Sequence, residues 1–569
     1  MFNIFEEKSK VKKSNLTAIV STFMILIMFF NVQFIYSADN NQTKNAQEDY
    51  LRISELMYYP EANHEDLEFI ELYNINTSPL DITNVAFTVG VTYTFSTTAS
   101  LPAKGMLLLV AFDPASVDPI EQARKQNFLS YYNLTEGSIT LKGPYVGKLS
   151  NSGEQLTVIA SNLDNIMDFE YSDTRSWPLA PQGSGHSLVP IDSAVINADT
   201  KVLNYGGNWR ASTYIKGSPG QVDPIVQTSV IINEFDSHTD YFDPEMPEYD
   251  SNDWIELYNT RTTNISLTNY YLSDDIDELD KWAIPTSLIL AKSYLSFDET
   301  TDFHYPINTG FGLNKTGESI ILSYLPGTSQ NRIVDCVKFK GQEINHSYGR
   351  YPDADPYWQT LFSPSQDIAN IHPNPELIIN EFMYNPPLTP QNPTENTADE
   401  FIEIYNPTTH NVALWNDMGT WVIDGGVQFI FPSDVLLASG ESMLIVSIDP
   451  AVPTALTAFK VRYGITNPNL KIYGPYTGTL SNSTEKIGIE KPQEPDVITD
   501  PVSWIVVDEA TYFDRTPWDS EADGTGNSFH RLSNDKAGDD PTNWSVASPS
   551  PGTVPSVSPK SDVSGWKSY

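Results

Sequence analysis

The sequence predicts an all-β protein made of three tandem β-sandwich domains. Three observations predict this fold class: turn residues and aromatic residues are abundant, one sequence pattern occurs three times, and few stretches show a helical apolar period. The chain has 569 residues, with 40 prolines, 31 glycines and 30 tyrosines. Domains usually contain about 100–200 residues, so three or four cores are expected. Many short apolar runs separated by turn signals are typical of sandwiches or barrels.

The acidic composition limits the classes of partner. The chain carries 33 Lys and Arg against 73 Asp and Glu, a formal net charge of −40. Nucleic-acid-binding proteins need basic stripes that displace counterions from phosphates. The sequence has no such stripe after its first residues, so we expect no nucleic-acid partner. An acidic surface suits cations or neutral polymers, and it also keeps a soluble chain monodisperse.

Residues 1–38 have the features of an export signal. Basic residues cluster between positions 8 and 13, an apolar run follows over residues 16–36, and the small residues Ser37 and Ala38 offer a cleavage point. The apolar run is nearly as long as a membrane span, so an uncleaved N-terminal anchor is the alternative. In both cases we expect a secreted or cell-surface protein that meets a membrane only through this segment.

Two phrases recur three times in the same order, as internal repeats do. The first has the form Ile-x-Glu and begins at Ile53, Ile232 and Ile379. The second has an aromatic residue, then Ile-Glu-x-Tyr-Asn, and it ends at Asn74, Asn259 and Asn406. Both phrases are predicted strands. In the first copy of the second phrase, Phe69, Glu71 and Tyr73 are expected on one face, and Ile70 and Leu72 on the other.

Later landmarks also recur, but the middle copy is reduced. A Gly-Pro-Tyr turn followed by Leu-Ser-Asn occupies residues 143–154 and 474–485. The middle copy keeps only part of this turn, at 312–318, and lacks the preceding segment that contains Phe128 and Tyr131 in the first copy. Each copy then closes with Ser-Pro, at Ser218, Ser363 and Ser550, and the middle copy lacks the glycine that follows in the other two.

In this order, the phrases resemble bacterial lamin-tail domains. The resemblance covers residues from about 51 to 553 and is weakest in the middle copy. It implies an immunoglobulin-like β-sandwich in each copy, found in exported multidomain proteins and often beside separate catalytic domains. It implies no catalytic residues, so we predict three tandem immunoglobulin-like, lamin-tail-like domains and no enzyme.

The predicted organisation follows from these landmarks. The ranges are a signal peptide or N-terminal anchor at 1–38, a linker at 39–50, domain 1 at 51–222, a divergent domain 2 at 228–371, domain 3 at 377–553 and a disordered tail at 554–569. The connections between domains are short, and Pro373 and Pro375 stiffen the second one. We therefore expect a semi-rigid rod of three beads.

Paired glutamates are the most distinctive polar residues of the repeats. The pairs are Glu55 with Glu71, Glu234 with Glu256, and Glu381 with Glu403. Paired carboxylates can do acid–base work or bind calcium. However, three equivalent active sites in a row are unusual. We therefore interpret each glutamate as an acceptor for backbone N–H groups at a strand end, or as the partner of a nearby arginine.

Two acidic stretches and two tryptophans are weaker site candidates. Calcium needs several oxygen ligands on a flexible loop, and calcium is the one cofactor that the sequence allows. The candidate ligands are Asp243, Glu245, Asp250, Asp253, Asp274, Asp275 and Asp277, although none matches the EF-hand spacing. Trp177 and Trp518 precede glycine-rich loops and are candidates for stacking on a sugar, although such residues are more often core or loop anchors.

Single reactive side chains have structural interpretations. Cys336 is the only cysteine, so no intramolecular disulfide forms. In an alternating strand it points the same way as Val334, which predicts a small buried core residue. His186 and His346 occupy corresponding late strands, and Asn527 takes that place in the third copy, which favours a hydrogen-bonding role over catalysis.

Three functions fit the sequence. The leading hypothesis is an exported, non-catalytic scaffold or adhesion protein that binds a cell-envelope polysaccharide or another exported protein. The alternatives are a calcium-stabilised glycan-binding protein and an accessory protein that positions a separate secreted hydrolase.

Overall fold

The computed structural model describes residues 46–553, except 62–63, 97, 198, 496–498 and 500. The described chain is mostly β-strand, which confirms the all-β prediction. The predicted signal or anchor, most of the 39–50 linker and the 554–569 tail lie outside the described residues. Among the described helices, none has the length and apolar character that crossing a membrane requires.

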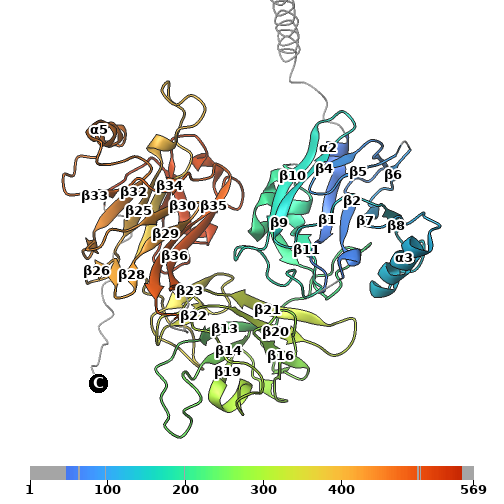
Figure 1. The fold of residues 1–569 in the computed structure, drawn as a ribbon, viewed down its shortest axis with the longest axis horizontal. Helices are drawn as coiled ribbons and strands as arrows, with labels where there is room; N and C mark the ends of the chain where they lie inside the picture. Colours follow the sequence, from blue (N-terminus) through green and yellow to red (C-terminus); the bar gives the residue numbers. More distant parts are fainter. Residues whose placement is uncertain are drawn as a thin grey trace, which may run out of the picture.

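The strands form three consecutive pairs of sheets, each around its own apolar core (Figure 1). We call residues 46–222 the first unit, 228–371 the second unit and 377–553 the third unit. In every unit the opening strand lies inside the larger sheet, next to the strand formed by the second repeated phrase.

The first unit combines a six-stranded and a four-stranded sheet. The larger sheet has the order β12 (Trp209–Ala211), β11 (Leu188–Pro190), β1 (Leu51–Met57), β2 (Phe69–Asn74), β7 (Met106–Val110) and β8 (Thr140–Lys142). The smaller has the order β10 (Asn165–Ser172), β9 (Gly153–Ile159), β4 (Ala86–Val89) and β5 (Tyr93–Thr94). Strands β3 (Leu80–Asp81) and β6 (Ser100–Leu101) pair separately, and the α-helices are α2 (Ala46–Tyr50), α3 (Pro119–Tyr131) and α4 (Asp192–Val195).

The second unit combines a five-stranded and a four-stranded sheet. The five-stranded sheet has the order β19 (Tyr294–Asp298), β14 (Trp254–Asn259), β13 (Val230–Asp236), β22 (Ser347–Arg350) and β23 (Trp358–Leu361). The four-stranded sheet has the order β17 (Trp282–Ala283), β16 (Tyr270–Ser273), β20 (Ser319–Tyr324) and β21 (Arg332–Lys338). Strands β15 (Ile265–Ser266) and β18 (Leu288–Ile289) pair separately.

The third unit combines a six-stranded and a five-stranded sheet. The six-stranded sheet has the order β33 (Lys471–Tyr473), β32 (Ser442–Val446), β25 (Phe401–Tyr405), β24 (Ile378–Met383), β37 (Ser528–Arg531) and β38 (Trp544–Ala547). The five-stranded sheet has the order β34 (Thr477–Gly478), β30 (Val427–Ile430), β29 (Val422–Gly425), β35 (Thr484–Gln493) and β36 (Ser503–Phe513). Two short pairs, β26 (Val412–Ala413) with β31 (Leu436–Leu437) and β27 (Trp415–Asn416) with β28 (Gly419–Thr420), and helix α5 (Pro453–Arg462) complete it.

The opening hairpin of each unit has the predicted two faces. In the first unit Ile70 and Leu72 lie in the core between the sheets, whereas Phe69 faces the opposite side and packs on α3. The register of the hairpin shifts at the same place in all three units, one residue before the first repeated glutamate. Such a bulge turns the side chain of one extra residue and bends the strand.

A helix covers the outer face of the larger sheet in the first and third units. Asp118 caps α3 by accepting a hydrogen bond from the backbone N–H of Ile120 at 2.8 Å, and Pro119 fits the first helical turn. Phe128 and Tyr132 then pack against Phe69. Helix α5 does the same in the third unit. The described second unit has no α-helix, and it is the unit whose sequence lacks the segment that forms α3 in the first unit.

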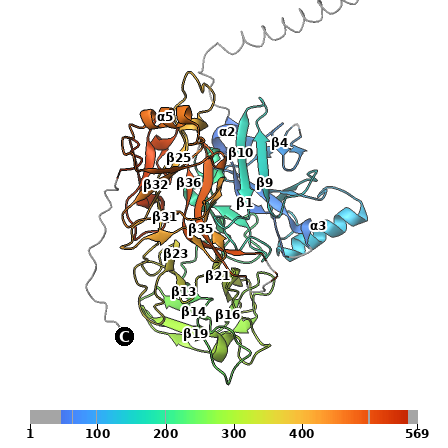
Figure 2. The ribbon, with the colours of Figure 1, turned by 60° about the vertical axis from the view of Figure 1, so that its left-hand side comes forward.

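The three units form a closed triangle, so the prediction of a rod is wrong. Both ribbon views place the second unit below the other two, which lie side by side above it (Figures 1 and 2). The first and third units contact each other directly: the rings of Tyr205 and Phe513 stack at 5.1 Å, and Asp199 pairs with Arg515 at 2.7 Å. The short connections fold the chain back instead of extending it.

The position of Cys336 also differs from the prediction. The register of β21 shifts so that Val334 is an extra residue, and this bulge breaks the expected alternation. Val334 and Val337 pack on the core of the second unit. The thiol of Cys336 instead hydrogen-bonds Ala180 of the first unit, and burial between the two units raises its pKa to about 12. A thiol with so high a pKa is a poor nucleophile at neutral pH.

Candidate functional site

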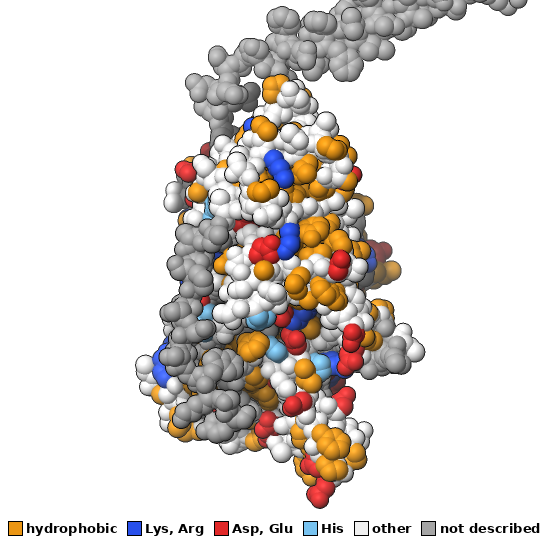
Figure 3. Space-filling model, turned by 90° about the vertical axis from the view of Figure 1, so that its left-hand side faces the viewer, with side chains coloured by type: hydrophobic (Ala, Val, Ile, Leu, Met, Phe, Trp, Pro, Cys, Tyr) orange, Lys and Arg blue, Asp and Glu red, His pale blue; other side chains and the backbone are white. Residues whose placement is uncertain are grey.

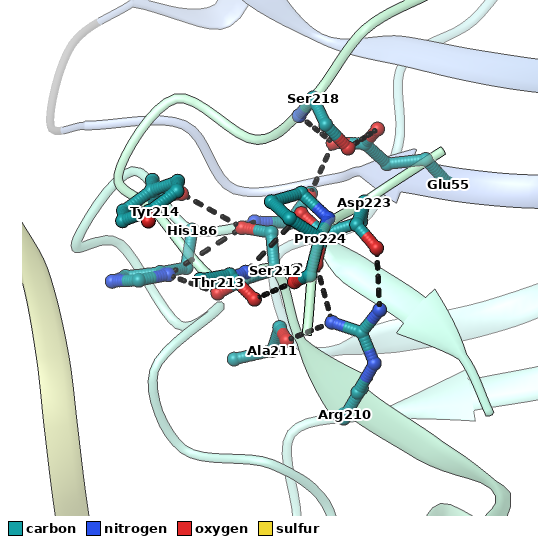
Figure 4. Close-up of polar contacts among 11 residues, drawn as sticks. Glu55, His186, Arg210, Ala211, Ser212, Thr213, Tyr214, Ser218, Asp223 and Pro224 are labelled. Carbon is teal, nitrogen blue, oxygen red and sulfur yellow. Dashed lines mark hydrogen bonds and ion pairs between the residues drawn. The ribbon is translucent and has the colours of Figure 1, made fainter. Parts of the chain in front are cut away.

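The paired glutamates fasten the closing segment of each unit to its opening hairpin. In the first unit Glu55 accepts hydrogen bonds from the backbone N–H of Ser218 at 2.9 Å and from its hydroxyl at 3.1 Å (Figure 4). It also accepts one from the hydroxyl of Ser187 at 2.5 Å. Glu71 accepts from the backbone N–H of Gly220 and, at 2.6 Å, from the hydroxyl of Ser54, the bulge residue. We call this arrangement the closing clamp.

The third unit has the same clamp. Glu381 accepts from the backbone N–H of Ser550 at 2.9 Å and from the hydroxyl of Ser528 at 2.7 Å. Glu403 accepts from the backbone N–H of Gly552 and, at 2.6 Å, from the amide of Asn380, which occupies the bulge. The structural interpretation of the repeated glutamates is therefore confirmed, because each accepts backbone N–H bonds.

The second unit builds the clamp two residues later than the sequence suggested. Glu234 accepts from the backbone N–H of Ser365 at 2.9 Å, and Glu256 accepts from that of Asp367 at 2.7 Å. The closing serine is therefore Ser365 and not Ser363. Asp367 has φ 64°, like Gly220 at 84° and Gly552 at 78°. Aspartate tolerates this left-handed conformation better than most residues, so the middle copy needs no glycine there.

Burial raises the pKa of the clamp carboxyls. Burial, and then the neighbouring Glu71, raise the pKa of Glu55 to about 8, while burial raises that of Glu71 to about 7. Burial also raises the pKa of Glu256 and Glu403 to about 8. Raised pKa values are a feature of acid–base catalysts. Here the carboxyl oxygens already face the donors of the closing segments, and Glu55 is 1% exposed, so the pairs are out of reach of a substrate.

A second buried acid anchors the later turn of each unit. Glu68 accepts from the hydroxyl of Tyr145 at 2.9 Å and from the backbone N–H of Leu149 at 3.0 Å. Glu400 makes the same two bonds in the third unit, to Tyr476 and Leu480. In the second unit Asp253 takes this place and accepts from the backbone N–H of Leu313 at 3.2 Å. Each of these acids directly precedes the second repeated phrase, a signal that the sequence contained.

The calcium candidates do not form a site. Asp253 is buried in the turn anchor, Asp274 and Asp275 pair with Lys281, and Asp243 caps the backbone N–H of Glu245. Within the residues that the structure describes, no three carboxylate, histidine or cysteine side chains converge as metal ligands. The remaining candidates, Asp250 and Asp277, stay in the two separate loops. None of the seven candidates therefore belongs to a set of metal ligands in the described chain.

The two tryptophans are core residues. Trp177 is 9% exposed and packs near Trp209, and Trp518 is 2% exposed and packs near Trp544. Trp518 also donates a hydrogen bond to the hydroxyl of Tyr205 at 3.2 Å, which links the first and third units. Trp518 offers no free face to a sugar, which contradicts the stacking hypothesis for that residue. The small exposed part of Trp177 lies in the wall of the cleft described below.

His186 joins the first unit to the second. Its Nε2 accepts the backbone N–H of Ile333 at 3.0 Å, so Nδ1 carries the proton and donates to the carbonyl of Ser212 at 2.7 Å (Figure 4). Burial lowers the pKa of His186 to about 4, which keeps the ring neutral. Beside it, Asp223 pairs with Arg210 and accepts from the backbone N–H of Thr213 at 3.0 Å. The histidine has a hydrogen-bonding role, as predicted.

The candidate functional site is the cleft where the three units meet, which we call the central cleft. Its volume is about 1600 Å³, and all three units line it. The edge strand of each smaller sheet contributes: β10 from the first unit, β21 from the second and β36 from the third. Of the site residues predicted from the sequence, Trp177 lies in the cleft wall. The cleft itself has no sequence motif, because it exists only once units distant in the sequence have packed together.

Charged contacts between units surround the central cleft. Arg175 of the first unit pairs with Glu509 of the third, beside Asp539. Burial and the neighbouring Glu509 raise the pKa of Asp539 to about 7, and Arg175 opposes this shift. Between the second and third units, Lys340 pairs with Glu490 at 2.5 Å. The cleft is thus framed by ion pairs whose partners come from different units.

The comparisons with known proteins are sparse. No family model matches the sequence, and no curated protein does. One solved structure, that of a DUF4876 family protein from Bacteroides thetaiotaomicron VPI-5482, matches at 12% identity over 54% of this chain and 95% of its own, with a TM-score of 0.22. A likeness at this TM-score supports no conclusion about fold or function.

Proposed function

We propose that the protein is an exported, non-catalytic scaffold that binds a cell-envelope polysaccharide or another exported protein. Its three units would be immunoglobulin-like, lamin-tail-like domains. The observation that carries the proposal is the central cleft: three units with fully committed clamp carboxyls pack around one shared, accessible surface. A binding protein needs such a preformed concave surface.

The outer surface supports a binding role less strongly. Figure 3 shows one side of the molecule, where hydrophobic side chains gather toward the upper part and acidic side chains toward the lower end, formed by the second unit. Ile430 and Val461 of the third unit are 73% and 75% exposed. Single exposed apolar side chains are normal on proteins, so they do not by themselves mark a docking surface.

A pull-down tests the proposal. The purified protein, immobilised, is incubated with the envelope fraction of its source cell, with and without calcium. Specific recovery of a polysaccharide or a surface protein, equal in both conditions, is the expected result. Calcium-dependent recovery would favour the calcium-stabilised alternative. Turnover of the recovered polymer by the purified protein, or recovery of nothing, would contradict the proposal.

A further inference from the structure

The wall of the central cleft is nearly neutral in an otherwise acidic molecule. Basic side chains are as numerous in the wall as acidic ones, although the chain as a whole has more than twice as many acids as bases. The acidic side chains of this wall would repel a polyanion, and its basic side chains would repel a polycation. The charge balance therefore favours an uncharged ligand.

The size of the central cleft favours a polymer. Sites for small molecules usually have volumes of about 300–1000 Å³. The central cleft, at about 1600 Å³, exceeds this range, and it is open to solvent along the junction of the three units. It has room for several residues of an extended chain.

The edge strands in the cleft are not prepared to pair with a peptide. An added β-strand needs free backbone N–H groups on the edge that it joins. In β10 the backbone N–H of Glu170 already donates to the side chain of Asn204 at 2.8 Å. In β21 that of Cys336 donates to Asp335 at 3.0 Å, and in β36 that of Thr511 donates to Asp539 at 2.6 Å. Side chains thus hold one backbone N–H on each of the three strands, which interrupts the row of donors that a pairing peptide would need.

Two acceptor oxygens in the wall lack donors. Asp514 is 6% exposed; one carboxylate oxygen pairs with Arg515, and within the described part of the chain the other oxygen, Oδ1, has no hydrogen-bond partner. Among the same residues, Oδ1 of Asn482 is likewise buried and unpaired, while its amide donates to Glu395 at 3.0 Å. Buried acceptors without donors are costly, and both oxygens are closed to solvent in this structure. A ligand with O–H donors would stabilise them once these two side chains turn toward the cleft.

We propose that the central cleft binds a neutral polyhydroxylated polymer, that is, an uncharged polysaccharide strand. Its hydroxyls would donate to Asp514 and Asn482. Arg515 is shared between Asp514 and Asp199, and the wall as a whole carries as many basic as acidic side chains, so a donor that brings no charge fits it. This inference rests on the proposed function and deepens it, because it names the site and the class of partner.

Binding assays with the full-length protein test this inference. The probes are dextran, laminarin, mannan and xylan, with heparin, polylysine and a Ser/Thr-rich peptide as comparisons. Thr174 is exposed in the cleft wall, so Thr174→Trp places a bulky side chain in the path of a bound polymer without disturbing a core. Thr135→Trp, at an exposed position outside the wall, is the matched control. Asn482→Leu removes one unpaired acceptor, and thermal midpoints verify that each variant folds.

We expect at least one neutral polysaccharide to bind, with affinity reduced about tenfold or more by Thr174→Trp and by Asn482→Leu, and unchanged by Thr135→Trp. Binding of none of the four neutral polymers, or preferential binding of heparin, polylysine or the peptide, would overturn the inference. If the envelope pull-down still recovers a partner with Thr174→Trp, the inference fails while the proposed scaffold function stands. If the pull-down recovers nothing, the proposed function itself fails.

Discussion

The second unit differs from the first and third in composition but not in the geometry of its clamp. It lacks the helix that covers the larger sheet elsewhere, and an aspartate, Asp367, takes the left-handed position that Gly220 and Gly552 occupy. Even so, Glu234 and Glu256 reach the same kind of backbone donors. The comparison shows that the clamp depends on the two glutamates, and that the residues around them can vary.

The largest expected effect comes from removing a clamp glutamate. Glu381→Ala leaves the backbone N–H of Ser550 and the hydroxyl of Ser528 buried without an acceptor, so we expect a loss of about 2–4 kcal/mol from the free energy of unfolding. Glu234→Ala should cost a similar amount in the second unit. Calorimetric unfolding measures both.

The matched control for these substitutions is Glu441→Ala. Glu441 pairs with Lys471 at 2.7 Å and accepts the backbone N–H of Ala438 at 2.9 Å, but the two side chains are about 30% exposed, so water can replace both partners. Such pairs contribute about 1 kcal/mol or less. If a clamp variant lost no more stability than this control, the proposed role of the glutamates would be contradicted. If only one of Glu381→Ala and Glu234→Ala lost stability, the clamps of the second and third units would not be equivalent.

The residue with left-handed backbone conformation in the closing segment should respond differently to substitution in the second and third units. Gly552→Ala places a methyl group 2.4 Å from Leu470 at φ 78°, and we expect it to destabilise the third unit by about 1–3 kcal/mol. Asp367→Gly removes a mild backbone strain but also the bond from the backbone N–H of Ser296, so the stability of the second unit should change by less than about 1 kcal/mol. If Asp367→Gly lost as much stability as Gly552→Ala, Asp367 would not be a simple replacement for glycine, and the two closing turns would not be equivalent.

The clamp carboxyls predict a dependence on pH. Glutamate in an unfolded chain has a pKa of about 4.3, whereas burial raises that of Glu71 to about 7 and those of Glu256 and Glu403 to about 8. Between these values the folded state binds more protons, so stability falls as pH rises. We expect a loss of about 2–4 kcal/mol for each of these carboxyls from pH 5 to pH 8, measured by calorimetry in low-phosphate buffers. A thermal midpoint that rises over this range would contradict the assignment of protonated clamps.

The smallest expected effect is that of calcium. The acidic loops of the second unit bring no three ligands together in the described structure, and Lys281 already pairs with Asp274. Calcium at millimolar concentration should therefore leave the thermal midpoint unchanged, since only a ligand that binds the folded state shifts it. A rise that Asp274→Asn or Asp250→Asn abolishes would restore calcium as a structural ion.

Local patterns predicted the parts of the molecule that depend on local geometry. The strand phrases, the two faces of β2 and the acceptor role of the glutamates follow from side-chain alternation and from the chemistry of a buried carboxyl. Asp253 was misread as a calcium ligand because its loop is acidic, although its position before Trp254 matches that of Glu68 before Phe69.

The remaining differences arise from geometry that a linear pattern does not contain. A bulge at Val334 turned Cys336 toward another unit, and the closing serine of the second unit moved to Ser365 because a left-handed Asp367 can replace glycine. The closed triangle depends on pairs such as Arg175 with Glu509, which are distant in sequence and show no local signal.

Small-angle X-ray scattering from residues 46–553 tests most directly the claim that the three units close around one cleft. A compact chain of this length has a radius of gyration of about 24 Å, whereas three such units end to end would give roughly 36 Å. The closed structure predicts a value near the lower figure, because several contacts, including Arg175 with Glu509, Tyr205 with Phe513 and Asp199 with Arg515, hold the first and third units together. A wild-type value near the upper figure would contradict the closed arrangement and remove the central cleft with it.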